Sequence, residues 1–564
     1  MSLALMPRVI VASSSSSVLT ARRPPQPPTL LDVPMTLQAP ARTRTRTRWS
    51  SPSTDDQFVV ENPATGRTVT VVQGAGPNEV DQAVCKAHAA HLRWKQRPAR
   101  ERGGYLRQIA EVIRAHADEL AMLESREMGK PIVQARQFDL EAAISIFEFF
   151  SSIVENLPNK ARDHDTVLDV TTLEPYGVIA AIVPFNWPPI HTHTAGKIAP
   201  ALAVGNAVVL KPPEQTPSVV LRMVELIQSV LPDRVVHAVP GKGEVGAALA
   251  GHRFVGKVSF TGSPRTGSAV MRNAACNLTP TLMELGGKNP LIVFDDANMH
   301  EALMAAIDGG FFNQGEACTA SSRILVQDKI YGEFAAKLCK AVTKLRVGDG
   351  ADPMTDVGPL VTRAQQKQVL DYLKLGVAEG ARIAAQAPLP EDPRLADGFY
   401  VSPTVLTDVT PRMRVAREEI FGPVVTLIPF SEEGEAVRIA NSNPFGLVAA
   451  VFTQDGDRAL RVSRQIRAGA VFVNNYVRIA IGTGFGGVGH SGFGREHAEE
   501  TLAETATPRQ SVGPPSATNC PTGPPPTACW RPEDRRCGPS HSKSITPQRD
   551  SCADRAAGWR RGRA

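Results

Sequence analysis

Four short segments of the chain combine polar side chains that could do chemistry with Gly or Pro residues that turn the backbone. They are residues 184–189 around Asn186, residues 211–214 with Lys211 and Glu214, residues 261–263 ending in Ser263, and residues 284–288 beginning with Glu284. Any one of these segments alone is typical of an ordinary turn. The stretch Gly262-Ser263-x-x-x-Gly267 is not the dinucleotide-binding fingerprint, and it lacks the Gly-Lys-Ser/Thr of a P-loop.

Each of these segments follows a short apolar run rich in β-branched residues. The apolar runs cover residues 178–183, 207–210, 235–239, 257–260 and 282–285, and a helical pattern at 217–230 separates two of them. Alternating strands and helices with fully apolar strands predict an α/β fold, with a parallel sheet covered on both faces. Such sheets bind ligands at the carboxyl ends of their strands, which is where the four segments lie.

Charge and cysteines divide between the body of the chain and its ends. Of the net charge of +6 on 564 residues, 1–50 contribute seven Arg and one Asp, and 514–564 contribute nine basic and four acidic residues, which leaves −5 on 51–513. This body has no nucleic-acid footprint, and no run of 18 apolar residues predicts a membrane-spanning helix. Four of the eight cysteines lie beyond residue 513, and the four in the body are too scattered for a disulfide framework or a zinc site. We therefore expect an intracellular protein with reduced thiols and no metal.

Both ends of the chain are expected to lie outside the folded body. Residues 1–54 form an extension that is either disordered or a targeting segment. Residues 1–34 are rich in Arg and Ser and poor in acids, as in a mitochondrial transit peptide, whereas a start at Met35 would leave the protein cytoplasmic. Residues 513–564 combine Pro, Ser, Arg and Cys with few aliphatic side chains, which predicts a disordered tail.

Four motifs in a fixed order carry a family resemblance. They are Met-Glu-Leu-Gly-Gly-Lys at 283–288, Phe-Asn-Gln-Gly-Glu-Ala-Cys at 312–318, Glu-Glu-Ile-Phe-Gly-Pro-Val at 418–424 and Gly-Phe-Gly-Gly-Val at 484–488. Together they resemble the NAD(P)-dependent, non-acylating members of the aldehyde dehydrogenase superfamily. The resemblance implies a Rossmann-like NAD-binding domain (55–156 and 176–286), a second α/β catalytic domain (287–483) and a small β oligomerisation arm (157–175 and 501–512).

The resemblance also implies catalytic roles for three residues. Cys318 matches the nucleophile, and a thiolate is the strongest side-chain nucleophile available for attack on an aldehyde carbon. The Asn186 amide, with the Cys318 backbone N–H, matches the donors to the oxyanion. Glu284 matches the base that activates water to hydrolyse the thioester left after hydride transfer, a residue that the coenzyme-A-acylating relatives generally lack.

The cofactor-binding positions follow from the same resemblance. Lys211 and Glu214 match the residues that bind the adenine ribose, Ser263 suits the pyrophosphate at a helix N-terminus, and Glu419 with Phe421 holds the nicotinamide ribose and ring. NAD is favoured over NADP, because a carboxylate at Glu214 accepts hydrogen bonds from ribose hydroxyls and would repel a 2′-phosphate. The expected partners are a small aldehyde and further copies of the chain, in a homodimer or homotetramer. Five aromatic residues either line a tunnel for apolar or aromatic aldehydes or belong to the ordinary core. They are Phe149, Phe150, Phe185, Trp187 and Phe485.

Two departures from the family pattern leave alternatives open. Asn186 and Lys197 are eleven residues apart instead of about nine, and the excess coincides with a His-Thr-His-Thr repeat at 191–194. Two extra helical residues would rotate everything beyond them by about 200°, so the chain could be a catalytically impaired nucleotide-binding relative. Pro508 falls in the expected last strand and cannot donate to a central ladder, which puts oligomerisation in question. The other alternative is an NADP-dependent semialdehyde dehydrogenase.

Overall fold

The computed structural model describes residues 57–157, 159–188, 193–232, 234–476 and 480–514. The expected extension at 1–54 and nearly all of the expected tail at 513–564 lie outside these residues. Across the described parts of the chain, no helix combines the length and the apolar character needed to cross a membrane.

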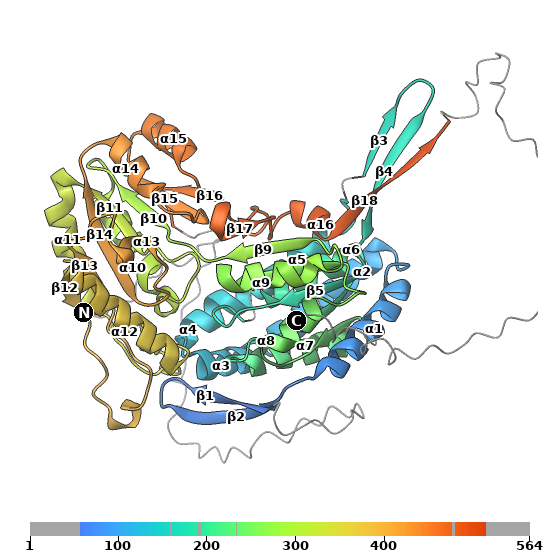
Figure 1. Ribbon diagram of the computed structural model, residues 1–564, viewed down its shortest axis with the longest axis horizontal. Coiled ribbons are helices and arrows are strands. Elements are labelled where there is room, and N and C mark those ends of the chain that lie inside the picture. Colours follow the sequence, from blue (N-terminus) through green and yellow to red (C-terminus); the bar gives the residue numbers. More distant parts are fainter. Residues whose placement is uncertain (1–56, 158, 189–192, 233, 477–479, 515–564) are drawn as a thin grey trace, which may run out of the picture. The chain divides into compact units, whose positions relative to one another are not determined.

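A six-stranded sheet in the order β17-β9-β8-β5-β6-β7 forms the first α/β unit (Figure 1). Five of its strands run parallel, and β17 pairs antiparallel with β9. All residues of β5 and β6 are buried, as expected for strands covered on both faces. The five parallel strands match the five apolar runs, which confirms the α/β prediction. The strands are β5 Val178–Ile182, β6 Ala207–Lys211, β7 Val236–Ala238, β8 Lys257–Gly262, β9 Thr281–Leu285 and β17 Gly492–Phe493.

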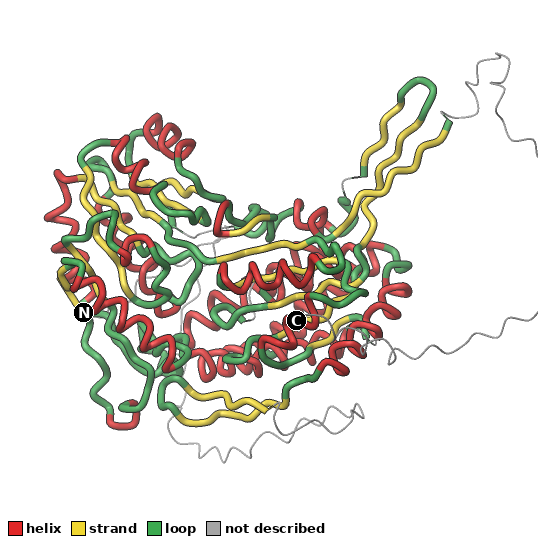
Figure 2. The backbone as a smooth tube through the Cα atoms, viewed as in Figure 1, coloured by secondary structure: helices red, strands yellow, loops and turns green. Residues whose placement is uncertain are grey.

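Helices before and between these strands pack against the sheet, and Figure 2 shows helices flanking the strands of both large sheets. A π-helical turn at Ala135–Leu140 and the antiparallel pair β1 Gln57–Asn62 and β2 Arg67–Gln73 complete this part of the chain. The helical pattern predicted at 217–230 is α7. The helices are α1 Pro77–Trp94, α2 Ala99–Ala115, α3 Ala117–Met128, α4 Ile132–Gln134, α5 Glu141–Ile153, α6 Thr194–Val204, α7 Pro217–Val230, α8 Gly243–Ala250 and α9 Pro264–Ala275.

The second α/β unit contains a seven-stranded sheet in the order β12-β13-β14-β11-β10-β15-β16. All its pairs are parallel except β12 with β13. Its strands are β10 Pro290–Val293, β11 Arg323–Gln327, β12 Arg382–Gln386, β13 Thr404–Thr407, β14 Val424–Phe430, β15 Val448–Phe452 and β16 Ala470–Val473. Its helices are α10 Met299–Phe311, α11 Asp328–Val342, α12 Arg363–Ala378, α13 Arg414–Arg417, α14 Glu433–Ala440 and α15 Gly456–Gln465. Only residues 286–289 separate β9 from β10, so the two sheets meet directly after Glu284.

A third sheet joins segments from distant parts of the chain in the order β18-β4-β3. It consists of β3 Lys160–Asp163, β4 Leu168–Pro175 and β18 Ala506–Gly513, and α16 Glu500–Glu504 precedes β18. β18 pairs with β4 along its whole length, straight through Pro508. Opposite Pro508, the Leu173 N–H donates to Asn159 Oδ1 on the β3 side (3.1 Å), so this pair is a non-hydrogen-bonded one. Pro508 therefore turns its nitrogen to the open edge and interrupts no bond to β4, which is why the strand tolerates it.

Candidate active site

Cys318 lies in the loop between the 3₁₀ turn Phe312–Gly315 and β11. Inside that turn Asn313 and Gln314 have φ values of 53° and 54°, in the left-handed region that non-glycine residues rarely adopt. Such a backbone persists only where its surroundings hold it. Asn289 supplies one such restraint, because its Nδ2 donates to the Cys318 carbonyl oxygen at 2.8 Å. The side chain of Cys318 is fixed in a loop where the residue is only 8% exposed.

Asn186 follows β5 and is 3% exposed. Its backbone oxygen accepts a hydrogen bond from Asn313 Nδ2 (2.9 Å), which joins it to the turn that precedes Cys318. The same oxygen also accepts a hydrogen bond from Lys130 Nζ (3.2 Å). Its side-chain Oδ1 lies 3.2 Å from Nε2 of His193. With the carbonyl end of the amide turned to His193, Nδ2 is the end that can donate to a substrate oxygen.

Glu284 lies in β9, 1% exposed, close enough to the Cys318 thiol for each group to shift the other's pKa. The pKa of Glu284 is raised to about 8: burial contributes most, the Glu496 carboxylate also raises it, and the thiol and Lys197 lower it. Among the described residues, neither carboxylate oxygen has a hydrogen-bond partner of ordinary geometry. The ionised carboxylate of Glu284 can therefore accept a proton from a reactant.

The surroundings of the Cys318 sulfur favour the thiol over the thiolate, because they raise the pKa of this group. Burial raises its pKa well above the ordinary value, and the carboxylates of Glu284 and Glu419 raise it further. A cysteine reacts as a nucleophile in its thiolate form, so any such reaction of this sulfur requires loss of the proton. Glu284 is the carboxylate that interacts most strongly with the thiol.

A buried ion pair lies beside Glu284. Lys197 Nζ is 2.9 Å from Glu496 Oε1 and 3.0 Å from Ser259 Oγ. Backbone bonds in both directions between Phe485 and Glu496 fix the position of that carboxylate. Sequence reasoning missed Glu496, because 299 residues separate it from Lys197 and no local pattern marks it.

The second half of the His-Thr repeat lies at the start of α6. His191 and Thr192 lie outside the described residues, but His193 and Thr194 lie within them. The Thr194 hydroxyl donates to the Pro188 carbonyl at 2.6 Å, and α6 begins at Thr194, after the repeat's first residues. Lys197 lies in the first turn of α6 and reaches Glu496 from there.

The expected adenine-side residues follow β6 and β8, strands that flank β5 in the sheet. Lys211 Nζ donates to the Pro212 carbonyl at 2.8 Å and lies 3.3 Å from Glu214 Oε1; burial lowers the pKa of this amine. Ser263 caps α9, accepting the Thr266 N–H at 3.2 Å. Since β9, β8, β5 and β6 are consecutive neighbours, all four sequence segments meet at one edge of the sheet.

Glu419 and Phe421 approach this edge from the second α/β unit. Glu419 Oε1 accepts the Gly287 N–H at 2.9 Å, and a Cβ added at Gly286 would lie 2.1 Å from Glu419 Oε2, so a larger residue at 286 would have to displace this carboxylate. Burial raises the pKa of Glu419 to about 7. The Phe421 ring meets Phe185 edge-on at 5.8 Å. A carboxylate and an aromatic ring thus stand at the junction of the two sheets.

An aromatic cluster packs beside the cysteine loop. Trp187 lies 5.7 Å from Phe312 and 5.8 Å from Phe138 between ring centroids, and Ala317, which precedes Cys318, joins the same cluster. Of the aromatic residues expected for a tunnel, Trp187 is the one in this cluster, whereas Phe150 belongs to the core of the first unit and Phe485 stacks on His497. Phe138 and Phe312 were missed because aromatic spacing does not distinguish pocket from core.

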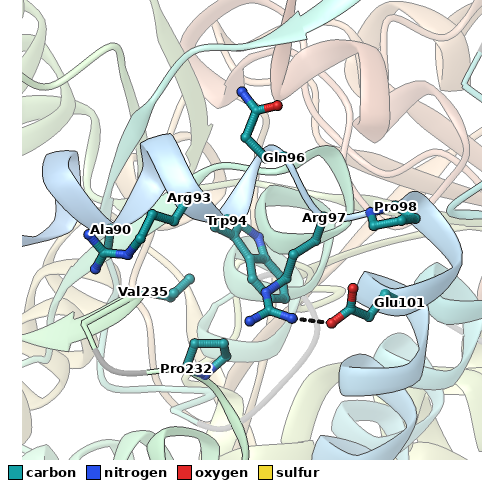
Figure 3. Close-up of a pocket in the computed structure, with 9 residues that line it drawn as sticks. All are labelled: Ala90, Arg93, Trp94, Gln96, Arg97, Pro98, Glu101, Pro232 and Val235. Carbon is teal, nitrogen blue, oxygen red and sulfur yellow. Dashed lines mark hydrogen bonds and ion pairs between the residues drawn. The ribbon is translucent and has the colours of Figure 1, made fainter.

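Two other places on the first unit lack this chemistry. A pocket of about 520 Å³ lies at the junction of α1 and α2 (Figure 3), but none of the residues described above lines it, and its Arg97 is paired with Glu101. Ligand atoms of Asp81, Cys85 and His252 lie within 4.8 Å of one another. There the Phe254 N–H donates to His252 Nδ1, so the ring proton sits on Nε2 and faces Asp81 Oδ1 at 3.2 Å. That proton occupies the position a metal would need.

Comparison with known proteins agrees with this geometry. The sequence model described as "Aldehyde dehydrogenase family" matches residues 49–510. The chain belongs to the aldehyde dehydrogenase family. It is 48% identical over 458 residues to aldehyde dehydrogenase citD of Monascus ruber, covering 81% of this chain and 91% of that protein.

Solved structures of family members share the fold of this aldehyde dehydrogenase. The crystal structure of PnpE from Pseudomonas sp. WBC-3 superposes with a TM-score of 0.81 at 38% identity, covering 84% of this chain and 98% of that one. Betaine aldehyde dehydrogenase from Staphylococcus aureus, in complex with NAD+, gives a TM-score of 0.79 at 35% identity, covering 82% and 92%. The expected α/β architecture and the expected enzyme class are both confirmed.

Proposed function

We propose that this aldehyde dehydrogenase oxidises an aldehyde to the carboxylic acid, using NAD and water. In the balanced reaction, aldehyde, NAD+ and water give the acid, NADH and a proton. The observation that supports the proposal is that Cys318 and Glu284 are buried and interact electrostatically, while the buried Asn186 is hydrogen-bonded to Asn313 in the turn before Cys318. Lys211, Glu214 and Ser263 follow neighbouring strands of the adjoining sheet. This set combines a nucleophile, a base and an oxyanion donor.

In the first half of the reaction, the Cys318 sulfur bonds to the aldehyde carbon. The carbonyl oxygen becomes an oxyanion, and the Asn186 Nδ2 and the Cys318 backbone N–H donate to it. Tight anchoring of both residues through Asn313 and Asn289 keeps these donors in place before the charge develops. The thiol must lose its proton first, so this half is expected to accelerate as the pH rises.

NAD fits the residues on the sheet edge. Glu214 is a partly exposed carboxylate that can accept hydrogen bonds from ribose hydroxyls, and its negative charge disfavours a 2′-phosphate. The N-terminus of α9, capped by Ser263, suits a pyrophosphate, and Glu419 offers a second carboxylate for a ribose. When bound, NAD accepts the hydride. Structures of PnpE and of the staphylococcal enzyme contain this cofactor, which supports the choice.

In the second half of the reaction, Glu284 takes a proton from the water that attacks the thioester on Cys318. Its two oxygens have capacity to accept that proton, and its pKa of about 8 makes it a stronger base than an ordinary carboxylate. The buried Lys197–Glu496 pair tunes this basicity, because its two charges act on Glu284 in opposite directions.

The substrate that best fits the site is an aldehyde with an apolar or aromatic body. Trp187, Phe138 and Phe312 present faces and edges of rings next to the cysteine loop. Such a surface binds an apolar group by burial and by ring stacking. For the assembly, we propose a homodimer or homotetramer in which the β18-β4-β3 sheet contributes to the subunit contact.

The experiment that tests the proposal is NADH formation with a panel of aliphatic, aromatic and semialdehyde substrates, beside Cys318→Ala. Turnover with NAD that disappears in the variant, while the variant still binds NAD, is the expected result. NAD binding without turnover of any aldehyde would instead favour the impaired nucleotide-binding relative. A preference for NADP with a semialdehyde would favour the other alternative.

A further inference from the structure

We propose that His193 is a positioning residue of this oxidation, which holds the Asn186 amide with its Nδ2 facing the reacting oxygen. The inference rests on the proposed function and adds a residue to it. His193 belongs to the His-Thr repeat, the segment that makes the spacing between Asn186 and Lys197 longer than the family pattern.

With the imidazole donating from Nε2, the contact selects one orientation of the Asn186 amide. His193 Nε2 lies 3.2 Å from Asn186 Oδ1, and both side chains are buried. A 180° turn of the amide would bring Nδ2 to the imidazole, so that a donor would face a donor when Nε2 carries the ring proton. With Oδ1 as acceptor, both N–H bonds of Nδ2 remain for other partners, and one of them can reach an oxyanion.

The backbone of Asn186 is already fixed without His193. Lys130 and Asn313 both donate to its carbonyl oxygen, and Asn313 also donates to the Glu316 carbonyl at 3.0 Å. These bonds place the Cα of Asn186, but the terminal torsion of an asparagine is broad and roughly two-fold. The contact between His193 Nε2 and Asn186 Oδ1 restrains that remaining torsion.

His193 is itself held by the start of α6. Its carbonyl oxygen accepts the Lys197 N–H at 3.1 Å, and Thr194, the next residue, donates from its hydroxyl to the Pro188 carbonyl. Lys197 is anchored in turn by its ion pair with Glu496. The imidazole therefore projects from a backbone position that these bonds hold at the start of α6, and it can hold the amide in one position.

The expected loss of rate in a His193 variant follows from the proposed role of His193 in orienting the Asn186 amide. Removal of an oxyanion donor lowers kcat by roughly 100- to 1,000-fold in other enzymes. Substitution of His193 leaves the donor in place and releases only its orientation, so we expect the rate of hydride transfer to fall by about tenfold in His193→Ala. The apparent affinity for NAD should not change, because the contact lies on Asn186 and not on the cofactor-binding edge.

A double-mutant cycle tests the inference. Turnover by the wild type, lost in Cys318→Ala, is established first, so that a failure of the proposed function is seen separately. The rate of the pre-steady-state NADH burst is then measured for His193→Ala, Asn186→Ala and the double variant. Because His193 acts through Asn186, the double variant should be no slower than Asn186→Ala alone. His193→Gln, whose amide can donate to Oδ1, should recover much of the rate.

Three results would overturn the inference. They are an unchanged burst rate in His193→Ala, a double variant whose loss equals the product of the two single losses, and a His193→Gln variant that is no faster than His193→Ala while binding NAD and unfolding like the wild type. His300→Ala, at an exposed histidine in α10, is the matched control and should leave the burst rate unchanged.

Discussion

Replacement of Glu284 by Gln should separate the two halves of the reaction. The amide keeps the shape of the side chain but cannot accept the proton of the attacking water. General-base catalysis contributes roughly 100- to 10,000-fold, so steady-state turnover should fall by at least about 100-fold. The variant should still release about one equivalent of NADH per site in a burst, because Cys318 and Asn186 are intact.

The pH dependence gives this prediction its magnitude. A carboxyl group with a pKa of about 8, as for Glu284, is about 9% ionised at pH 7 and about 91% ionised at pH 9. The base is the ionised form, so its contribution to hydrolysis rises about tenfold between these two values and is lost as the pH falls. In Glu284→Gln that tenfold rise should be absent from the steady-state rate.

Stopped-flow measurement of NADH absorbance provides the assay. The burst and the steady state must be analysed separately, because the raised thiol pKa of Cys318 makes the burst rate pH-dependent as well. The reasoning would be refuted if Glu284→Gln showed no burst, or if its steady-state rate kept both the wild-type magnitude and the tenfold rise with pH.

Three further predictions concern cofactor, substrate and stability. Glu214→Ala should raise the ratio of kcat/KM for NADP to that for NAD by roughly tenfold, since Lys211 remains and the repelling carboxylate is gone; an unchanged ratio would remove Glu214 from cofactor selection. Phe312→Ala should lower kcat/KM for an aromatic aldehyde by about tenfold relative to a two-carbon aldehyde; equal losses for both would show that the cluster with Trp187 is only core. Arg323→Met should lower the free energy of unfolding by roughly 3 kcal/mol, because the buried guanidinium donates to three backbone carbonyls at 2.8–2.9 Å; denaturant titration measures this, and a wild-type midpoint would contradict it.

Local pattern was enough to predict the residues that follow strands. Apolar runs ending in Gly or Pro marked the positions of Asn186, Lys211 and Ser263, because a parallel sheet collects the carboxyl ends of its strands at one edge. Neighbouring strands in space are not neighbours in sequence, yet the edge is common to all of them. Predicting these three residues therefore required no knowledge of the register between strands.

Contacts between distant segments could not be predicted in the same way. An isolated β-bridge with Phe485 fixes the backbone of Glu496, whose side chain pairs with Lys197. Nothing in the sequence around Glu496 indicates a buried charge. Pro508 argued against a strand, but the outcome depended on which side of β18 its nitrogen faces, a matter of register with β4. The contact of His193 with Asn186 likewise depends on where α6 begins.

The central claim is that the aldehyde carbon becomes covalently bound to Cys318 and is released by water that Glu284 activates. Its most direct test is the intact mass of Glu284→Gln after mixing with NAD and a turned-over aldehyde. We predict a gain equal to the aldehyde less two hydrogens, located on the peptide that contains Cys318 and absent without NAD. A gain of that mass on another cysteine, or no gain from a variant that has formed NADH, would contradict the account.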